Sequence, residues 1–258
     1  VCKFTAQGQP TSFAATQTAC TPIVNFADGF VPVSMAVDVG GGLVMLSDTG
    51  KLMRFLPNGN VDTAFAPPSG LFILPTLDNV DPDQFVRSTA LTLDATGAIY
   101  VVGTDQTPAI ARAYATKLRV NVNTGALFFD PAFNGGVPLQ VPCGGDPALG
   151  CRLESVDATA GRLTITGTHG FKAIVARLNA TSGQPVSPPF EVPLPVDAIS
   201  VTVNDAALQH DNKLLILGTS SYLSPAPAQV WVARINLSCA AAALDTSNFS
   251  VPNGYVIF

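Results

Sequence analysis

The fold is decided by the stretch SVDATAGRLTITGTHGFKAIVARLNATSGQPVSPPF, residues 155–190. It reads as an apolar strand, a tight turn, a purer apolar strand, a polar turn, a third strand with one cation, and a last segment that ends on Phe. Three more units keep this order, at residues 34–65, 90–133 and 200–249. Four strands in a repeat of about 50 to 60 residues predict the blades of a β-propeller, because solenoid coils are usually shorter.

The second strand of each unit is the most apolar. The four versions are GLVML (42–46), AIYVVG (98–103), RLTITG (162–167) and KLLILG (213–218). Aliphatic and β-branched residues on both faces predict an inner strand that neighbouring sheets cover on each side. An Asp recurs before this strand, where we expect an Asx-turn. The four candidates are Asp38, Asp94, Asp157 and Asp205.

Composition agrees with an all-β protein. The 258 residues include 22 Gly and 21 Pro, which disfavour long helices, and the 47% of hydrophobic residues exclude disorder. Only 12% are charged and the formal charge is −5, which argues against nucleic-acid binding. The uncharged window 214–233 contains Gly218, Pro225 and Pro227, so it predicts strands and a loop rather than a membrane span.

The two ends of the chain resemble parts of one further unit. Residues 1–13 match the last part of the repeat, and NGYVIF within 251–258 resembles the start of the second strand. An unpaired sheet edge invites aggregation, so we expect both ends to form a composite blade that closes the ring. Gly254 follows Phe249 by only five positions, which leaves open a three-stranded blade, a longer protein, or closure by another subunit. We therefore expect one domain over residues 1–258 with about five four-stranded antiparallel blades.

Several segments are similar to a known pattern. They are MRFLPNGNVDTAF (53–65), VARLNATSG (175–183), VARINLS (232–238) and LDTSNF (244–249). They resemble the delta-60 repeat of bacterial β-propellers. The resemblance implies a propeller exported from a bacterial cell and says little about activity, because propellers serve binding, scaffolding and catalysis alike. Unit three departs from the pattern, since Ser187 stands where the other units have Asp.

The third strand of each unit carries a cation. The residues concerned are Lys3, Arg54, Arg119, Arg177 and Arg234, and an Asp follows three of them across the next turn. We predict the cross-strand pairs Arg54–Asp62, Arg119–Asp130 and Arg234–Asp245, and no such pair in unit three. Because surface ion pairs contribute about 0–1 kcal/mol, their role would be to fix strand register.

Cysteine spacing indicates the redox compartment. Cys143 and Cys151 flank the Gly- and Pro-rich segment GGDPALG, which can bend back and predicts a disulfide. No CxxC or Cys/His cluster points to a metal site. Cys2 and Cys20 are a possible second pair, which would leave Cys239 as a thiol. Structural disulfides predict an extracellular or periplasmic location, and the first residue, Val1, indicates a mature product or a fragment.

The loops between strands two and three and the connectors between blades share one end of a propeller. Loops on a rigid scaffold usually carry binding residues, so we expect a protein or surface partner at this end. The candidate contact residues are Gln106, Tyr114, Tyr222, Leu71 and Phe72. The resulting hypothesis is a non-catalytic binding or scaffolding module with no cofactor.

Two alternatives stay open. One is a hydrolase or lyase in which His169, beside Asp48 or Asp105, acts as a general base, although the spacing matches no triad. The other is a structural subunit of an extracellular surface assembly that uses the apolar segment LFILP (71–75). The acidic cluster Asp78, Asp81 and Asp83 is a weak Ca²⁺ candidate, because its spacing does not match an EF-hand loop.

Overall fold

The computed structural model describes Gln9 and residues 30–75, 86–106, 110–146, 148–194, 198–222, 227–237 and 242–258. Within these ranges the chain forms four antiparallel sheets, and its helical segments are short turns at Asn134–Gly136 and Ser250–Gly254. None of the helices among these residues has the length and apolar character needed to cross a membrane.

Each sheet is one blade of the propeller. Blade one contains β1 (Pro32–Val37), β2 (Leu43–Ser47), β3 (Lys51–Phe55) and β4 (Leu71–Ile73). Blade two contains β5 (Val86–Leu93), β6 (Ile99–Asp105), β7 (Arg112–Val120), β8 (Leu127–Phe129) and β9 (Leu139–Gln140). Blade three contains β10 (Cys151–Thr159), β11 (Arg162–His169), β12 (Lys172–Asn179) and β13 (Pro185–Glu191). Blade four contains β14 (Ser200–Leu208), β15 (Lys213–Ser221), β16 (Gln229–Asn236), β17 (Ala243–Leu244) and β18 (Tyr255–Ile257).

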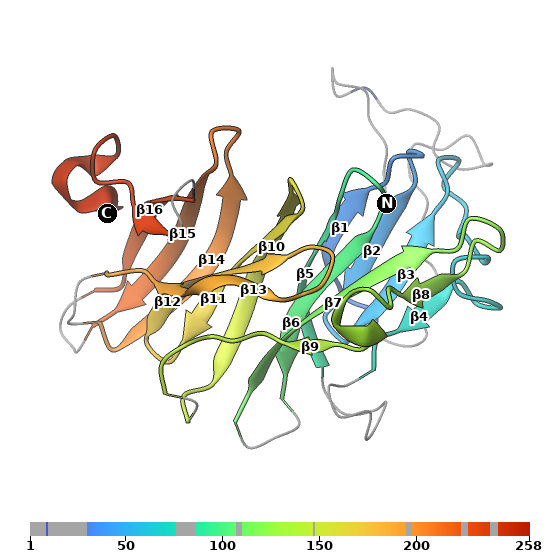
Figure 1. Cartoon of the computed structure of the whole chain (residues 1–258), viewed down its shortest axis with the longest axis horizontal. Coiled ribbons are helices and arrows are strands. Elements are labelled where there is room, and N and C mark those ends of the chain that lie inside the picture. The colour runs from blue at the N-terminus through green and yellow to red at the C-terminus, as the bar shows by residue number, and fades with distance from the viewer. Residues whose placement is uncertain are drawn as a thin grey trace.

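The blades stack in chain order, and Figure 1 shows blades one and four at opposite ends of the row. An apolar core fills each junction. Leu46 and Ile99 lie between blades one and two, Tyr100 and Ile165 between two and three, and Val175 and Trp231 between three and four. Every residue of β6 is buried, as expected for an inner strand covered on both faces. The predicted all-β propeller fold is confirmed.

The first strand of every blade contains a β-bulge at the same place. The extra residues are Val33, Thr89, Glu154 and Asn204. In blades two to four a glycine of the second strand lies opposite the bulge, and these are Gly103, Gly167 and Gly218. A Cβ atom at these glycines would lie 2.3, 2.0 and 2.4 Å from a carbonyl oxygen of the first strand. The close backbone approach at the bulge therefore explains why three of the apolar runs end on Gly.

The fourth strand is split in blades one, two and four. β8 and β9 both pair with β7, and β17 and β18 both pair with β16. In blade one, Val61 bridges to Phe55 before β4 pairs with β3. The second part starts six positions after a Phe in each case, at Leu71, Leu139 and Tyr255.

This spacing corrects the expectation for the chain ends. β18 pairs with β16 through Trp231–Ile257, Val232–Val256 and Ala233–Tyr255, so it completes blade four instead of contributing to a composite fifth blade. The short interval after Phe249 is the normal interval within a fourth strand. Of the matching segment 1–13, only Gln9 lies within the described residues.

The predicted cation–carboxylate pairs are present in blades one, two and four. Arg54 Nη1 lies 3.2 Å from Asp62 Oδ2, Arg234 Nη2 lies 2.7 Å from Asp245 Oδ2, and Arg119 Nε lies 3.5 Å from Asp130 Oδ2. In blade two, however, the structural counterpart of Arg54 is Lys117, which is buried and holds the same carboxylate at 3.0 Å. The amide of Asp130 donates to the Lys117 carbonyl, as that of Asp62 does to Arg54. The predicted cation, Arg119, therefore lies two residues beyond the position that is equivalent to Arg54.

The same carboxylates shape the split in the fourth strand. Their second oxygen accepts a backbone N–H from Ala64, Ala132 or Asn248 and so stabilises the turn that interrupts the strand. Blade three has Ser187 instead, and β13 runs without interruption from Pro185 to Glu191. The residue opposite the cation, Asp in three blades and Ser in blade three, therefore decides whether the fourth strand is interrupted.

Arg177 in blade three has no counter-ion among the described residues. It is 4% exposed, its Nε has no hydrogen-bond partner, and burial together with the neighbouring Arg162 lowers its pKa. Ser187 lies directly opposite it in the register. Ser187→Asp is therefore expected to raise the free energy of unfolding by about 1–2 kcal/mol, because it supplies a charge-assisted hydrogen bond. Chemical denaturation checks this, with Ser187→Asn as the uncharged control; equal stability of the two variants would contradict it.

The expected Asx-turns are only partly confirmed. Asp38 Oδ1 accepts the amides of Gly40 and Gly42, and Asp94 Oδ1 accepts those of Thr96 and Ala98. Asp157 and Asp205 lie inside β10 and β14, so the prediction is wrong for them. In blade four, Gln209 takes the position of Asp94. The backbone N–H of Gln209 donates to the Lys213 carbonyl across this turn, as that of Asp94 does to the Ala98 carbonyl.

Candidate functional site

A disulfide joins Cys143 to Cys151, as the spacing predicts, with the two Cα atoms 6.3 Å apart. Both cysteines are buried, and the bridge ties the connector after blade two to the first residue of β10. The Gly170 amide donates to the Gly150 carbonyl and holds the closed loop against blade three. Cys2, Cys20 and Cys239 lie outside the described residues.

Removal of this bridge should lower stability. Cys143→Ser together with Cys151→Ser is expected to reduce the free energy of unfolding by about 2–3 kcal/mol, because the unfolded chain regains the entropy of an open loop. Denaturation with and without reductant measures the change. Reductant should lower the stability of the wild type by this amount more than that of the double variant, and a wild-type chain whose intact mass shows two thiols at these positions would contradict the prediction.

The disulfide borders a cavity of about 980 Å³ at the loop-rich end, between blades two and three. Its polar side chains are Arg112, Gln140 and His169. The rest of its wall is Ile110, Ala111, Ala113, Val141, Pro142, Cys143, Gly144, Gly145, Leu149 and Cys151. Arg112 starts β7 and Gln140 ends β9, so strand ends hold both groups in place. We call this cavity the stapled pocket.

His169 ends β11 and is only 4% exposed. Its Nε2 lies 2.9 Å from the main-chain oxygen of Asp146, within the disulfide loop. A Cβ built on Gly145 would lie 2.6 Å from His169 Cε1 and 3.3 Å from Glu191 Oε1, which places this carboxylate beside the ring. Glu191 itself pairs with Lys172 across blade three. The sequence offered no signal for Glu191, because the register between β12 and β13 brings it to this end.

The two acids suggested as partners of His169 lie in other blades. Asp105 ends β6 in blade two, is fully buried, and pairs with Arg112 at 3.0 Å. Asp48 follows β2 in blade one, where its carbonyl accepts the amide of Ser88. The structure thus gives each of the three residues a separate local role.

Two candidate contact residues lie toward the loop-rich end. Gln106 directly follows β6 and is exposed. Tyr222 follows β15, is half-buried, and its hydroxyl accepts a hydrogen bond from Ser220.

Three other candidates belong to the packed sheets. Tyr114 is 2% exposed inside β7, its hydroxyl bonds Ser88 at 2.7 Å, and burial raises its pKa, so it is a core residue. Leu71 and Phe72 form β4 rather than a connector. The Phe72 ring packs edge-on against Phe129 of blade two. Residues 113–118 of β7 are all buried, so no alternation of apolar and polar residues along this strand marks Tyr114 as a core residue.

The acidic candidates Asp78, Asp81 and Asp83 lie outside the described residues. Across the part of the chain that the structure describes, no three His, Cys, Asp or Glu side chains gather closely enough to hold a metal ion.

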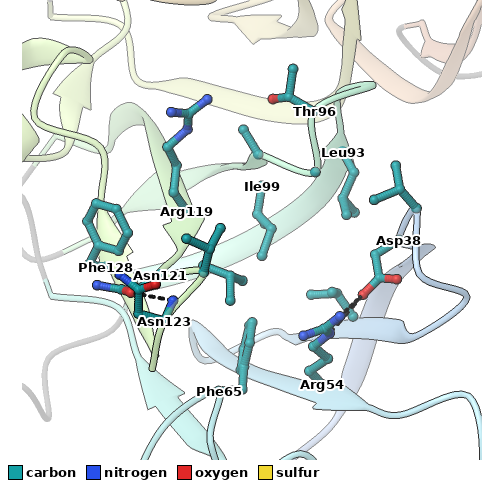
Figure 2. A pocket seen from close by; sticks show the side chains of 16 residues that line it. Asp38, Arg54, Phe65, Leu93, Thr96, Ile99, Arg119, Asn121, Asn123 and Phe128 are labelled. Atoms are coloured by element: carbon teal, nitrogen blue, oxygen red, sulfur yellow. Dashed lines mark hydrogen bonds and ion pairs between the residues drawn. The ribbon is translucent and has the colours of Figure 1, made fainter. Parts of the chain in front are cut away.

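A second cavity of about 570 Å³ lies at the turn side, between blades one and two. Figure 2 shows Asp38 and Arg54 joined at one side and Asn121, Asn123 and Phe128 at the other, with Phe65 and Ile99 in between. Arg54 pairs with Asp38 at 2.6 Å as well as with Asp62. Arg119 also lines the cavity, so three charged side chains border it beside apolar ones such as Phe65, Leu93 and Ile99. Sequence reasoning missed it, since its walls are short turns of two adjacent blades.

Comparisons with known proteins support the fold. No protein-family model matches the sequence, and no curated protein matches it. Among solved structures, the Dos1 propeller is similar with a TM-score of 0.52 and 12% identity, over 83% of this chain and 46% of that one. A polysaccharide lyase, an ulvan lyase bound to its saccharide, aligns with a TM-score of 0.49 and 11% identity over 81% of this chain and 56% of that one. This chain therefore spans about half the length of these structures. The likeness to the Dos1 propeller agrees with the β-propeller fold of its sheets.

Proposed function

We propose that this propeller is an exported binding module that holds a protein partner in the stapled pocket at its loop-rich end. The observation that carries the proposal is the construction of this cavity from fixed parts. Two strand ends and a disulfide-closed loop form its walls. A preorganised wall reduces the conformational entropy lost on binding.

The chemistry of the pocket favours an apolar segment that carries a carboxylate. Ile110 and Leu149 expose about two-fifths of their surface at the wall. The ion pair with buried Asp105 fixes the Arg112 guanidinium, whose planar fork suits a carboxylate. Gln140 adds an amide that can both donate and accept.

Catalysis by His169 has less support. A general base must reach the proton that it removes, whereas a main-chain carbonyl engages the His169 ring and little of the residue is exposed. The buried disulfide supports an extracellular or periplasmic location, because such bonds persist in oxidising compartments.

A charge placed in the pocket tests the proposal. Leu149→Glu adds a carboxylate that repels the carboxylate proposed for the partner, and Leu217→Glu is the matched control, since Leu217 is 42% exposed in blade four against 41% for Leu149. Affinity capture from the native extracellular fraction should recover the same protein with the wild type and Leu217→Glu, and at least about tenfold less with Leu149→Glu. Equal recovery with both variants, or none with the wild type, would overturn the proposal. Circular dichroism confirms that each variant is folded.

A further inference from the structure

The β-bulges place a second set of polar groups around the innermost strands. The bulged residues Thr89, Glu154 and Asn204 of blades two, three and four border one cavity of about 270 Å³. The other lining residues are Arg87, Thr104, Arg152, Thr202 and Val203. Three of these, Arg87, Arg152 and Thr202, stand two positions before a bulged residue, so β5, β10 and β14 each supply an equivalent pair of side chains. Bulges often redirect side chains next to binding sites.

We call this space the axial cavity. Its charge is set by two arginines, Arg87 and Arg152, and by Glu154. Burial raises the pKa of Glu154, while Arg152 and Arg87 act in the opposite direction, which places both guanidinium groups near it. Within the described ranges, neither arginine has a carboxylate oxygen within 4 Å. With Glu154 ionised, the three groups carry a net charge of +1.

Blade one shows that the bulge does not by itself require polar residues. Its equivalents of Arg87 and Thr89 are Val31 and Val33, which are 55% and 44% exposed. A bulge in the same fold therefore accommodates apolar side chains at both positions. The charged and hydroxyl-bearing residues of the other three blades need an explanation other than folding.

We propose that the axial cavity binds a small hydroxy acid. The ligand carboxylate would meet the guanidinium groups of Arg87 and Arg152, which bind planar oxyanions through paired N–H donors. The ligand hydroxyls would bond Asn204 and Thr202, which are exposed toward the cavity. A volume below the usual 300–1,000 Å³ of drug-sized pockets restricts the ligand to a small molecule. This site is separate from the stapled pocket and does not depend on the proposed partner.

Calorimetric titration of the full chain tests the assignment with four probes. Gluconate carries both chemical features, glucose only hydroxyls, acetate only a carboxylate, and sulfate is an anion of another shape. Gluconate should bind with a dissociation constant below about 1 mM and at least about tenfold more tightly than the other three. No heat with gluconate would overturn the proposal, and so would equal affinity for sulfate, which would mark an unselective anion site.

Three variants connect the binding to these residues. Arg152→Gln and Arg87→Gln should each weaken gluconate binding at least about tenfold. Glu154→Gln should tighten it at least about threefold, because it removes a like charge. The control is Arg162→Gln, the same change at an exposed arginine of blade three outside the cavity, and its affinity should equal that of the wild type. Equal affinities in all four variants would refute the assignment, and Leu149→Glu should leave gluconate binding unchanged.

Discussion

Gly167→Ala is expected to lower the free energy of unfolding by about 3–5 kcal/mol, one of the largest single-residue effects in this molecule. The added methyl carbon would lie 2.0 Å from the Arg152 carbonyl oxygen and 2.9 Å from Leu153 Cα. Both neighbours are backbone atoms of the bulge in β10, so no side-chain rotation relieves the clash. The first two strands of blade three would have to separate. Urea denaturation followed by circular dichroism measures the loss.

Gly150→Ala is the matched control for this prediction. Its methyl carbon would find its nearest neighbours at 3.5 to 3.8 Å, which is ordinary contact, and its backbone lies outside the left-handed region. This variant should be unchanged or more stable by up to about 1 kcal/mol, because alanine restricts the unfolded chain. Similar losses for both variants would show that close backbone approach at the bulge is not the cause.

Asp245→Asn is expected to destabilise blade four by about 2–3 kcal/mol. The carboxylate is buried, accepts a hydrogen bond from Arg234 Nε at 2.9 Å, and lies 3.1 Å from Lys213 Nζ. The amide removes the counter-ion of Arg234 and leaves Lys213 with only the more exposed carboxylate of Asp211. Asp211→Asn is the control, since Asp211 also lies near Lys213, at 3.5 Å, but on the surface. A loss as large for Asp211→Asn would contradict the prediction.

The effect of Asp245 should depend on pH. Burial alone would raise its pKa, but hydrogen bonds from Lys213, Arg234, Ser247 and the Asn248 amide outweigh it and lower the pKa from 3.8 to about 2. A carboxyl whose pKa is lower in the folded state stabilises the fold above its unfolded pKa and loses this contribution as the pH falls. The stability difference between wild type and Asp245→Asn should therefore be complete above about pH 4 and shrink between pH 4 and 2. A difference that stays constant over this interval would exclude the ionised carboxylate as its source.

The repeat in the sequence was sufficient to predict the architecture. Alternating apolar strands at a regular interval specify blades, and the recurrent cation and Asp specify a bond between strands three and four. Local loop chemistry likewise predicted the disulfide between Cys143 and Cys151. These features depend on residues close in the chain, where spacing controls geometry.

The errors arise where register decides the outcome. Lys117 and Arg119 both follow the apolar part of β7, and only the pairing with Asp130 shows that Lys117 occupies the buried position. Tyr114 lies opposite Gly103, and Trp231 lies opposite Gly218, so each large ring covers a glycine that the bulge requires. A one-residue bulge changes the face of every later side chain in its strand. The glycines opposite the bulges belong to the second strand, so the pattern of the first strand does not show which of its residues is the extra one. The axial and stapled cavities depend on these registers and were therefore not predictable.

The linear order of the described blades determines how a destabilising change in one blade affects the stability of the others. Among the described strands, each sheet packs against its neighbours in the chain, and no core cluster joins blade one to blade four. In such a linear array the total stability is close to a sum of the stability of each unit and one coupling term per junction. A destabilising substitution in one end blade then weakens a single junction and leaves the stability of the opposite end blade nearly unchanged. The two proposed binding sites lie at the inner blades, two and three, with blade four contributing to the axial cavity, so they can outlast the loss of blade one.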